Sequence, residues 1–70
     1  SQAALLLIHD LIAQNCQKWA NKNVMLKFTN LAWVQVLKDG KSRDRWVMDI
    51  ARSIWSYTSI NNINIVCSQD

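Results

Sequence analysis

Few side chains of this sequence could do chemistry, and they are scattered. His9 stands next to Asp10, and the nearest cysteine, Cys16, lies seven positions further on. Adjacent residues of a helix point in different directions, so we do not expect His9 and Asp10 to form a catalytic pair. Cys67 is remote from His9, so neither a Cys–His pair nor a metal-ligand spacing is present. The single Gly excludes a glycine-rich phosphate loop.

The carboxylates do not suggest a catalytic or metal-binding site either. The acidic residues are five Asp and no Glu. We interpret Asp10, Asp39, Asp44 and Asp49, which are spread along the chain, as solvated surface charges. We therefore expect no catalytic residue, no metal ion and no cofactor.

The length and composition of the chain indicate one small domain, residues 1–70. Half of the residues are apolar, four are Trp and none is Pro, which excludes a disordered tail or a linker. Two cysteines are too few for a disulfide scaffold, so we expect buried, reduced thiols in an intracellular protein, cytoplasmic or nuclear. The apolar run Ala3–Ile8 is far shorter than the ~20 residues that span a bilayer, so no membrane contact is expected.

Hydrophobic periodicity predicts the helices and the strand in the first half of the chain. Apolar residues from Leu5 to Trp19 recur at steps of three and four, which indicates a helix over Gln2–Asn21. Val24–Phe28 is an apolar run of strand length, typical of a strand buried on both faces. Asn30 is a suitable N-cap for a helix over Leu31–Lys38.

Turn and cap residues organise the second half. Gly40 ends the preceding helix in left-handed geometry, and Ser42 caps a helix over Arg43–Ile60, with Asp44 in its first turn. Asn61-Asn62 is a turn signal. Ile63–Cys67 then reads as a strand with Ile63, Ile65 and Cys67 on one face and Asn64 and Val66 on the other.

The predicted order is helix-strand-helix-helix-strand, and the fold class is α/β. Two short strands joined by helices imply a crossover connection and parallel pairing. Two strands make a narrow sheet with unpaired edges, which we expect oligomerisation to complete.

Two surface features have alternative interpretations. Lys38, Lys41, Arg43 and Arg45 outnumber the nearby Asp39 and Asp44 by two positive charges. This cluster is either a solvated turn, which the pattern favours, or a phosphate contact with Trp46 stacking on a base. Trp33 lies off the apolar side of its short helix and is either a core residue or an anchor for a partner.

Most of the chain resembles a known family. Val24–Leu37 resembles the central strand and following helix of a retroelement ribonuclease H domain. Gly40–Asp44 and Ala51–Trp55 are similar to the same family, especially to the reverse transcriptase polyproteins of DIRS-type retrotransposons. Asn62–Ile65 matches the entry into its last strand. The resemblance implies the carboxy-terminal part of a ribonuclease H-like fold.

The departures from that family concern its chemistry. Family members cleave the RNA strand of an RNA–DNA hybrid with carboxylates that hold two Mg²⁺ ions. The family's Asp falls at Thr29, its Glu near Ala3 or Ala4, and its His at Gln69. The first three strands, one of which supplies another Asp, have no counterpart here. The resemblance therefore implies a degenerate, truncated unit without metal ligands.

These observations predict a binding function. The leading hypothesis is a protein-interaction module that forms a homodimer, or takes up a partner chain, with Val24, Leu26, Phe28 and Trp33 at or near the interface. The alternative is weak binding of duplex or hybrid nucleic acid by Lys38, Lys41, Arg43 and Arg45.

Overall fold

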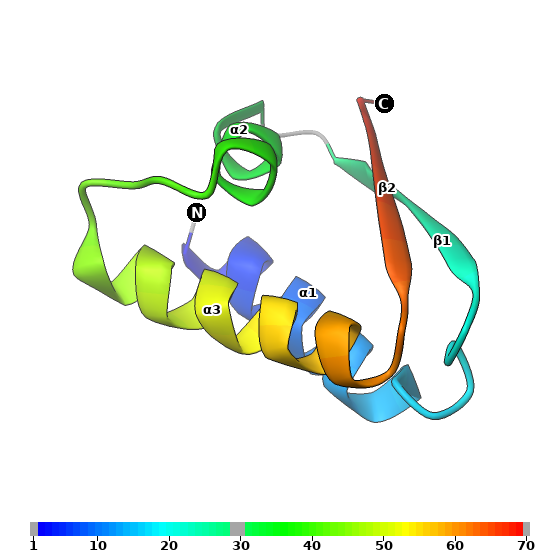
Figure 1. The fold of residues 1–70 in the computed structure, drawn as a ribbon. Coiled ribbons are helices and arrows are strands. Elements are labelled where there is room, and N and C mark those ends of the chain that lie inside the picture. Colours follow the sequence, from blue (N-terminus) through cyan, green and yellow to red (C-terminus); the bar gives the residue numbers. More distant parts are fainter. Residues whose placement is uncertain (1, 29–30, 70) are drawn as a thin grey trace.

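The computed structural model describes residues 2–28 and 31–69. Its elements are α1 (Gln2–Asn15), β1 (Asn23–Phe28), α2 (Leu31–Asp39), α3 (Arg45–Ile60) and β2 (Asn64–Gln69) (Figure 1). The predicted order helix-strand-helix-helix-strand is confirmed. The cap expected at Asn30 lies outside the described residues.

The two strands pair in parallel, as predicted. The register runs from Asn23 opposite Asn64 to Phe28 opposite Gln69. All three helices lie on one side of this two-stranded sheet (Figure 1). The chain is thus a small α/β unit of two layers.

The expectation that Val24–Phe28 is buried on both faces is wrong. Along β1, exposed residues alternate with more buried ones, and Met25 is 64% exposed on the outer face. Its register partner Val66 is 42% exposed. Only the inner face is covered by helices, so a continuous apolar run here does not signify two-sided burial.

Asparagines end α1 and open both strands. The predicted helix to Asn21 stops at Asn15, whose Nδ2 donates to the Leu11 carbonyl at 2.8 Å. Residues 16–21 form turns, and Asn21 has a φ of 62°. The Asn21 amide donates to the Asn61 carbonyl at 3.0 Å, so the chain must leave the helical path to reach the second turn. The predicted turn at Asn61-Asn62 is confirmed, with Asn62 at φ 53°.

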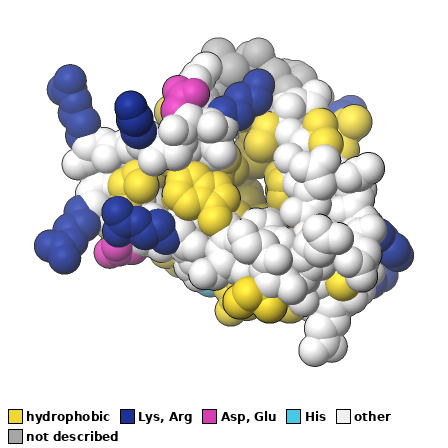
Figure 2. Space-filling view, in the orientation of Figure 1, with side chains coloured by type: hydrophobic (Ala, Val, Ile, Leu, Met, Phe, Trp, Pro, Cys, Tyr) yellow, Lys and Arg dark blue, Asp and Glu magenta, His cyan; other side chains and the backbone are white. Residues whose placement is uncertain are grey.

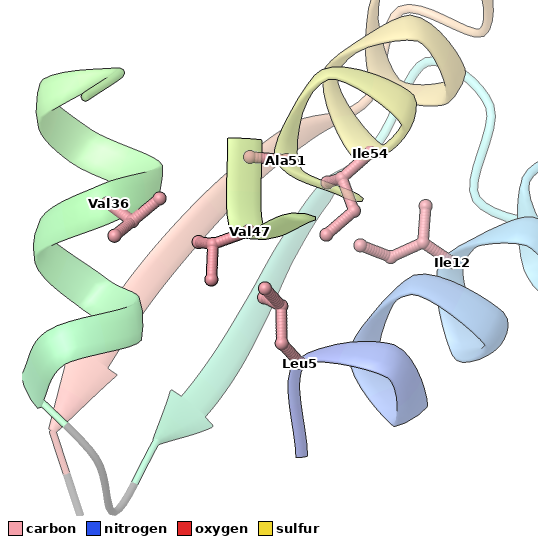
Figure 3. Close-up of a cluster of buried hydrophobic side chains, with 6 residues drawn as sticks. All are labelled: Leu5, Ile12, Val36, Val47, Ala51 and Ile54. Atoms are coloured by element: carbon pink, nitrogen blue, oxygen red, sulfur yellow. The ribbon is translucent and has the colours of Figure 1, made fainter. Parts of the chain in front are cut away.

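The core lies where the three helices meet. Leu5 and Ile12 of α1 pack against α3, and a cluster of six buried side chains joins these two helices to α2 (Figure 3). The cluster contains Leu5, Ile12, Val36, Val47, Ala51 and Ile54. These residues join α1, which precedes β1, to the two helices that connect β1 to β2.

The link between α2 and α3 confirms one expected feature and corrects another. Gly40 has a φ of 73° and ends α2 in left-handed geometry, as predicted. The N-cap of α3, however, is Asp44 rather than Ser42. The Asp44 carboxylate accepts hydrogen bonds from the amides of Trp46 at 2.9 Å and Val47 at 3.5 Å. Ser42 instead accepts from the Asp44 amide at 3.2 Å.

We expect Asp44→Ala to lower the free energy of unfolding by ~1 kcal/mol, because it removes the acceptor for two free helix amides. Urea denaturation measures the change. Asp44→Asn preserves a good cap and is the control. If Ser42→Ala costs more than Asp44→Ala, Ser42 is the cap after all.

Candidate functional site

His9, Asp10 and Ser53 form a hydrogen-bonded array between α1 and α3. His9 Nε2 lies 2.8 Å from Ser53 Oγ, and His9 Nδ1 lies 3.2 Å from Asp10 Oδ1. The ring of Tyr57 meets the imidazole edge-on, with centroids 5.8 Å apart. The expectation that His9 and Asp10 point apart is therefore wrong. Ser53, which is 44 positions from His9, was not foreseen, since only the packing of α1 on α3 brings it near.

Proton positions in this array follow from its donors and acceptors. An ionised carboxylate only accepts, so in the tautomer that matches Asp10 the His9 ring donates from Nδ1 and accepts from the Ser53 hydroxyl at Nε2. This is the direction found in Ser–His–Asp hydrolases. Acyl transfer also needs N–H donors aimed at a developing oxyanion. Ser53 lies inside α3, where backbone amides bond to helix carbonyls, and the two hollows described below are lined by other residues. The His9–Ser53 hydrogen bond links α1 to α3.

A double-mutant cycle tests that structural role. We expect His9→Ala and Ser53→Ala to show a coupling free energy of ~1 kcal/mol in urea unfolding, because each variant removes the same hydrogen bond. Asp10 is 55% exposed, so Asp10→Asn should cost less than ~0.5 kcal/mol. Strictly additive effects of the two alanine variants would contradict the contact.

The positions that the family resemblance implies for metal ligands hold no carboxylate. Ala3 is exposed on α1 and Ala4 beside it is half-buried, while Thr29 lies outside the described residues. Across residues 2–28 and 31–69, no group of three His, Cys, Asp or Glu side chains could hold a metal ion.

Three cations surround an open hollow at the link between α2 and α3. Lys41 and Arg43, both foreseen as candidates, line it together with Arg52. Arg52 was missed, although it follows Met48, which also lines the hollow, at helical spacing. The other lining residues are Gly40 and Ser42. Figure 2 shows Lys and Arg side chains gathered over this end of the molecule.

These cations are largely unpaired. The ion pair of Arg52 with Asp49 joins Nη1 and Oδ1 at 3.8 Å, and both side chains are exposed. Among the described residues, this is the one ion pair that involves a Lys or Arg. Lys38 and Arg45, the remaining candidates, are exposed but do not line the hollow. The positive charge is thus available to a ligand.

The four candidate interface residues differ in accessibility. Val24 and Leu26 are half-buried on the inner face of β1, and Phe28 is only 5% exposed. Trp33 of α2 is half-buried, and its buried Nε1 has no hydrogen-bond partner among the described residues. On β1 it is the outer face, through Met25, that presents an apolar side chain to solvent.

A second hollow lies between the helices and the inner sheet face. It has a volume of about 210 Å³ and opens between α2, α3 and β2, where Figure 2 shows hydrophobic side chains around a recess. Cys67 of β2 lines this hollow. Both Cys67 and Cys16 are free thiols and both are half-buried, so the expectation that they are buried is wrong. Burial raises the pKa of the Cys67 thiol, while the positive charge of Lys38 acts in the opposite direction.

Comparison of the chain with protein-family models, with curated proteins and with solved structures gave no match. Within the described residues, none of the helices has both the length and the apolar character needed to cross a bilayer.

Proposed function

We propose that the chain is a catalytically inactive, ribonuclease H-like unit of retroelement origin that acts as a protein-interaction module. The element order and the parallel strand pair agree with what the family resemblance implies. The residues Ala3, Ala4, Thr29 and Gln69 stand where that family carries ionisable ligands. The observation that carries the proposal is the open edge and outer face of β1.

The sheet leaves backbone groups of β1 without a strand partner. β1 pairs with β2 along one side, so its other side has no strand partner among the described residues. Unpaired strand edges readily accept another strand. The outer face beside this edge carries Met25 and Val66 in register, both exposed and apolar. A strand added along β1 would pair the edge and widen the sheet.

Interface size favours strand addition over face-to-face packing. Six-residue strands that rise about 3.3 Å per residue and lie about 4.8 Å apart present an outer face of only about 200 Å². Stable interfaces bury about 800 Å² per partner. The outer face alone is therefore too small, and edge pairing must contribute backbone hydrogen bonds and neighbouring surface.

A second copy of this chain can pair along β1 in a defined register. Two-fold symmetry makes the two β1 strands antiparallel, and residues directly opposite each other then share a face. Centring the pair on Met25 brings two exposed methionines together and places Lys27 opposite Asn23. Centring it on Leu26 would place Met25 against Lys27, and centring it on Lys27 would oppose like charges, which is destabilising.

We expect Met25→Cys to form a disulfide-linked dimer under mild oxidation, in a chain whose Cys16 and Cys67 are replaced by Ala. Residues opposite each other across an antiparallel pair have Cβ atoms about 4.5–5.5 Å apart, near disulfide range. Non-reducing electrophoresis measures the product. Lys27→Cys, two positions from the symmetry axis, is the matched control and should stay monomeric.

Other outcomes are equally decisive. A folded monomer at micromolar concentration in sedimentation would exclude the homodimer. Efficient crosslinking of Val66→Cys in place of Met25→Cys would move the interface to β2. Separately, Mg²⁺-dependent cleavage of an RNA–DNA hybrid by the chain would overturn its assignment as catalytically inactive.

A second function, nucleic-acid binding without cleavage, is favoured by one specific observation. Lys41, Arg43 and Arg52 converge on a single hollow, and only Arg52 is in an ion pair. Unpaired cations at such spacing suit the phosphates of a duplex or hybrid, since each contact releases counterions. Trp46 is partly exposed at the start of α3, next to Arg45, where it could stack on a base.

We expect the triple variant Lys41→Ala, Arg43→Ala, Arg52→Ala to weaken binding of an RNA–DNA hybrid. The slope of the logarithm of the binding constant against the logarithm of the salt concentration should become less steep by about 0.9 per lost phosphate contact. Fluorescence anisotropy across a salt series measures both. Lys18→Ala, Lys22→Ala, Lys27→Ala removes the same charge elsewhere and is the control. Equal losses in the two variants would show attraction by net charge alone.

A further inference from the structure

The hollow between the helices and the inner sheet face has the lining of an apolar ligand site. Its walls come from every element of the fold: α1, β1, α2, α3, β2 and the residue before β2. The lining residues are Ile12, Leu26, Leu37, Ile54, Trp55, Thr58, Ile63, Asn64, Ile65 and Cys67. Seven of these ten are aliphatic or aromatic, and none carries a formal charge at neutral pH.

The few polar groups in the lining have little to offer an ion. The Thr58 hydroxyl donates to the Trp55 carbonyl at 3.0 Å, and the amide of Asn64 donates to Asn23 Oδ1 at 3.1 Å. Burial keeps the Cys67 thiol in its neutral form, because it raises the pKa of that group. A charged or strongly hydrogen-bonding ligand would therefore lose its hydration without compensation.

Several walls of the hollow are incompletely buried. Ile12, Ile54 and Ile63 belong to the buried core, whereas Leu26, Leu37, Trp55 and Ile65 are only half-buried. An apolar molecule in the hollow would remove more of these four side chains from water. Burial of apolar surface is favourable by roughly 25 cal/mol per Å², so such a molecule would stabilise the fold.

We propose that this hollow binds a compact aromatic or similarly apolar small molecule, of the size of benzene or indole. A cavity of about 150 Å³ lined by aliphatic and aromatic residues stays dry and takes up benzene. The hollow here measures about 210 Å³, which leaves room for a second fused ring. Trp55 supplies a ring for an edge-to-face or offset stack.

The experiment uses the intact chain with benzene and with indole as probes, measured by isothermal titration and by thermal unfolding. We expect both probes to bind and to raise Tm. Ile65→Phe fills the hollow and should weaken binding by about tenfold or more, which corresponds to 1.4 kcal/mol. Leu7→Phe, at an exposed position of α1 that does not line the hollow, is the matched control and should leave affinity unchanged.

Thiol protection gives a second readout that needs no core substitution. With indole at ten times its Kd, alkylation of Cys67 by iodoacetamide should slow about tenfold, because the probe occupies about nine-tenths of the sites. Cys16 does not line the hollow and should react at an unchanged rate. Mass spectrometry separates the two cysteines.

Two results would overturn the proposal. One is the absence of any Tm shift or protection with both probes, which would mean that the hollow closes in solution. The other is an equal effect of Ile65→Phe and Leu7→Phe, which would mean that the probes bind elsewhere. If Ile65→Phe fails to fold, Leu37→Phe fills the same space from α2. None of these outcomes depends on whether the chain forms a dimer.

Discussion

Four asparagines at the start of the two strands set the register on which the rest of the structure depends. The side chain of Asn62 donates to Asn21 at 3.0 Å, and that of Asn64 donates to Asn23 at 3.1 Å. Side chains alternate along a strand, so a slip of one residue in either strand would exchange its inner and outer faces. Leu26 would then face solvent and Met25 would face the helices. These two side-chain contacts and the backbone bond from Asn21 to Asn61 lie at the start of the strand pair, and they favour the same alignment as the burial of the apolar inner face.

Once the register is set, the helices can cover one face and leave the other open. α1 packs along α3 through Leu5 and Ile12, and the His9–Ser53 hydrogen bond joins the same two helices through polar groups. α2 completes the layer through Val36 and leaves the hollow beside Trp55. The chain therefore presents three distinct surfaces: an open strand edge with an apolar outer face, a basic hollow at the α2–α3 link, and an apolar hollow between the helices and the sheet.

Local sequence signals predicted the elements but not their contacts. The element order, parallel pairing, Gly40 geometry and Asn61-Asn62 turn follow from periodicity and turn chemistry, which depend on near neighbours. The end of α1 at Asn15 does not follow from them, because the apolar spacing continues through Cys16 and Trp19, which lie in turns. These turns lead to a backbone contact between Asn21 and Asn61, which are far apart in the sequence. The N-cap of α3 was assigned to Ser42 instead of Asp44, because both residue types are good caps and the two positions are only two residues apart. Ser53 was invisible in the sequence because its partner is 44 residues away.

The parallel pairing of β1 and β2 also determines the order in which the chain can fold. Every register pair joins residues 41 positions apart, so no strand contact forms until that loop has closed. Helices form from local contacts and can assemble earlier. β1 consequently spends the early part of folding as an unpaired apolar strand, guarded by the single charge of Lys27. Slow closure of that loop therefore lengthens the time for which the unpaired strand is exposed to aggregation.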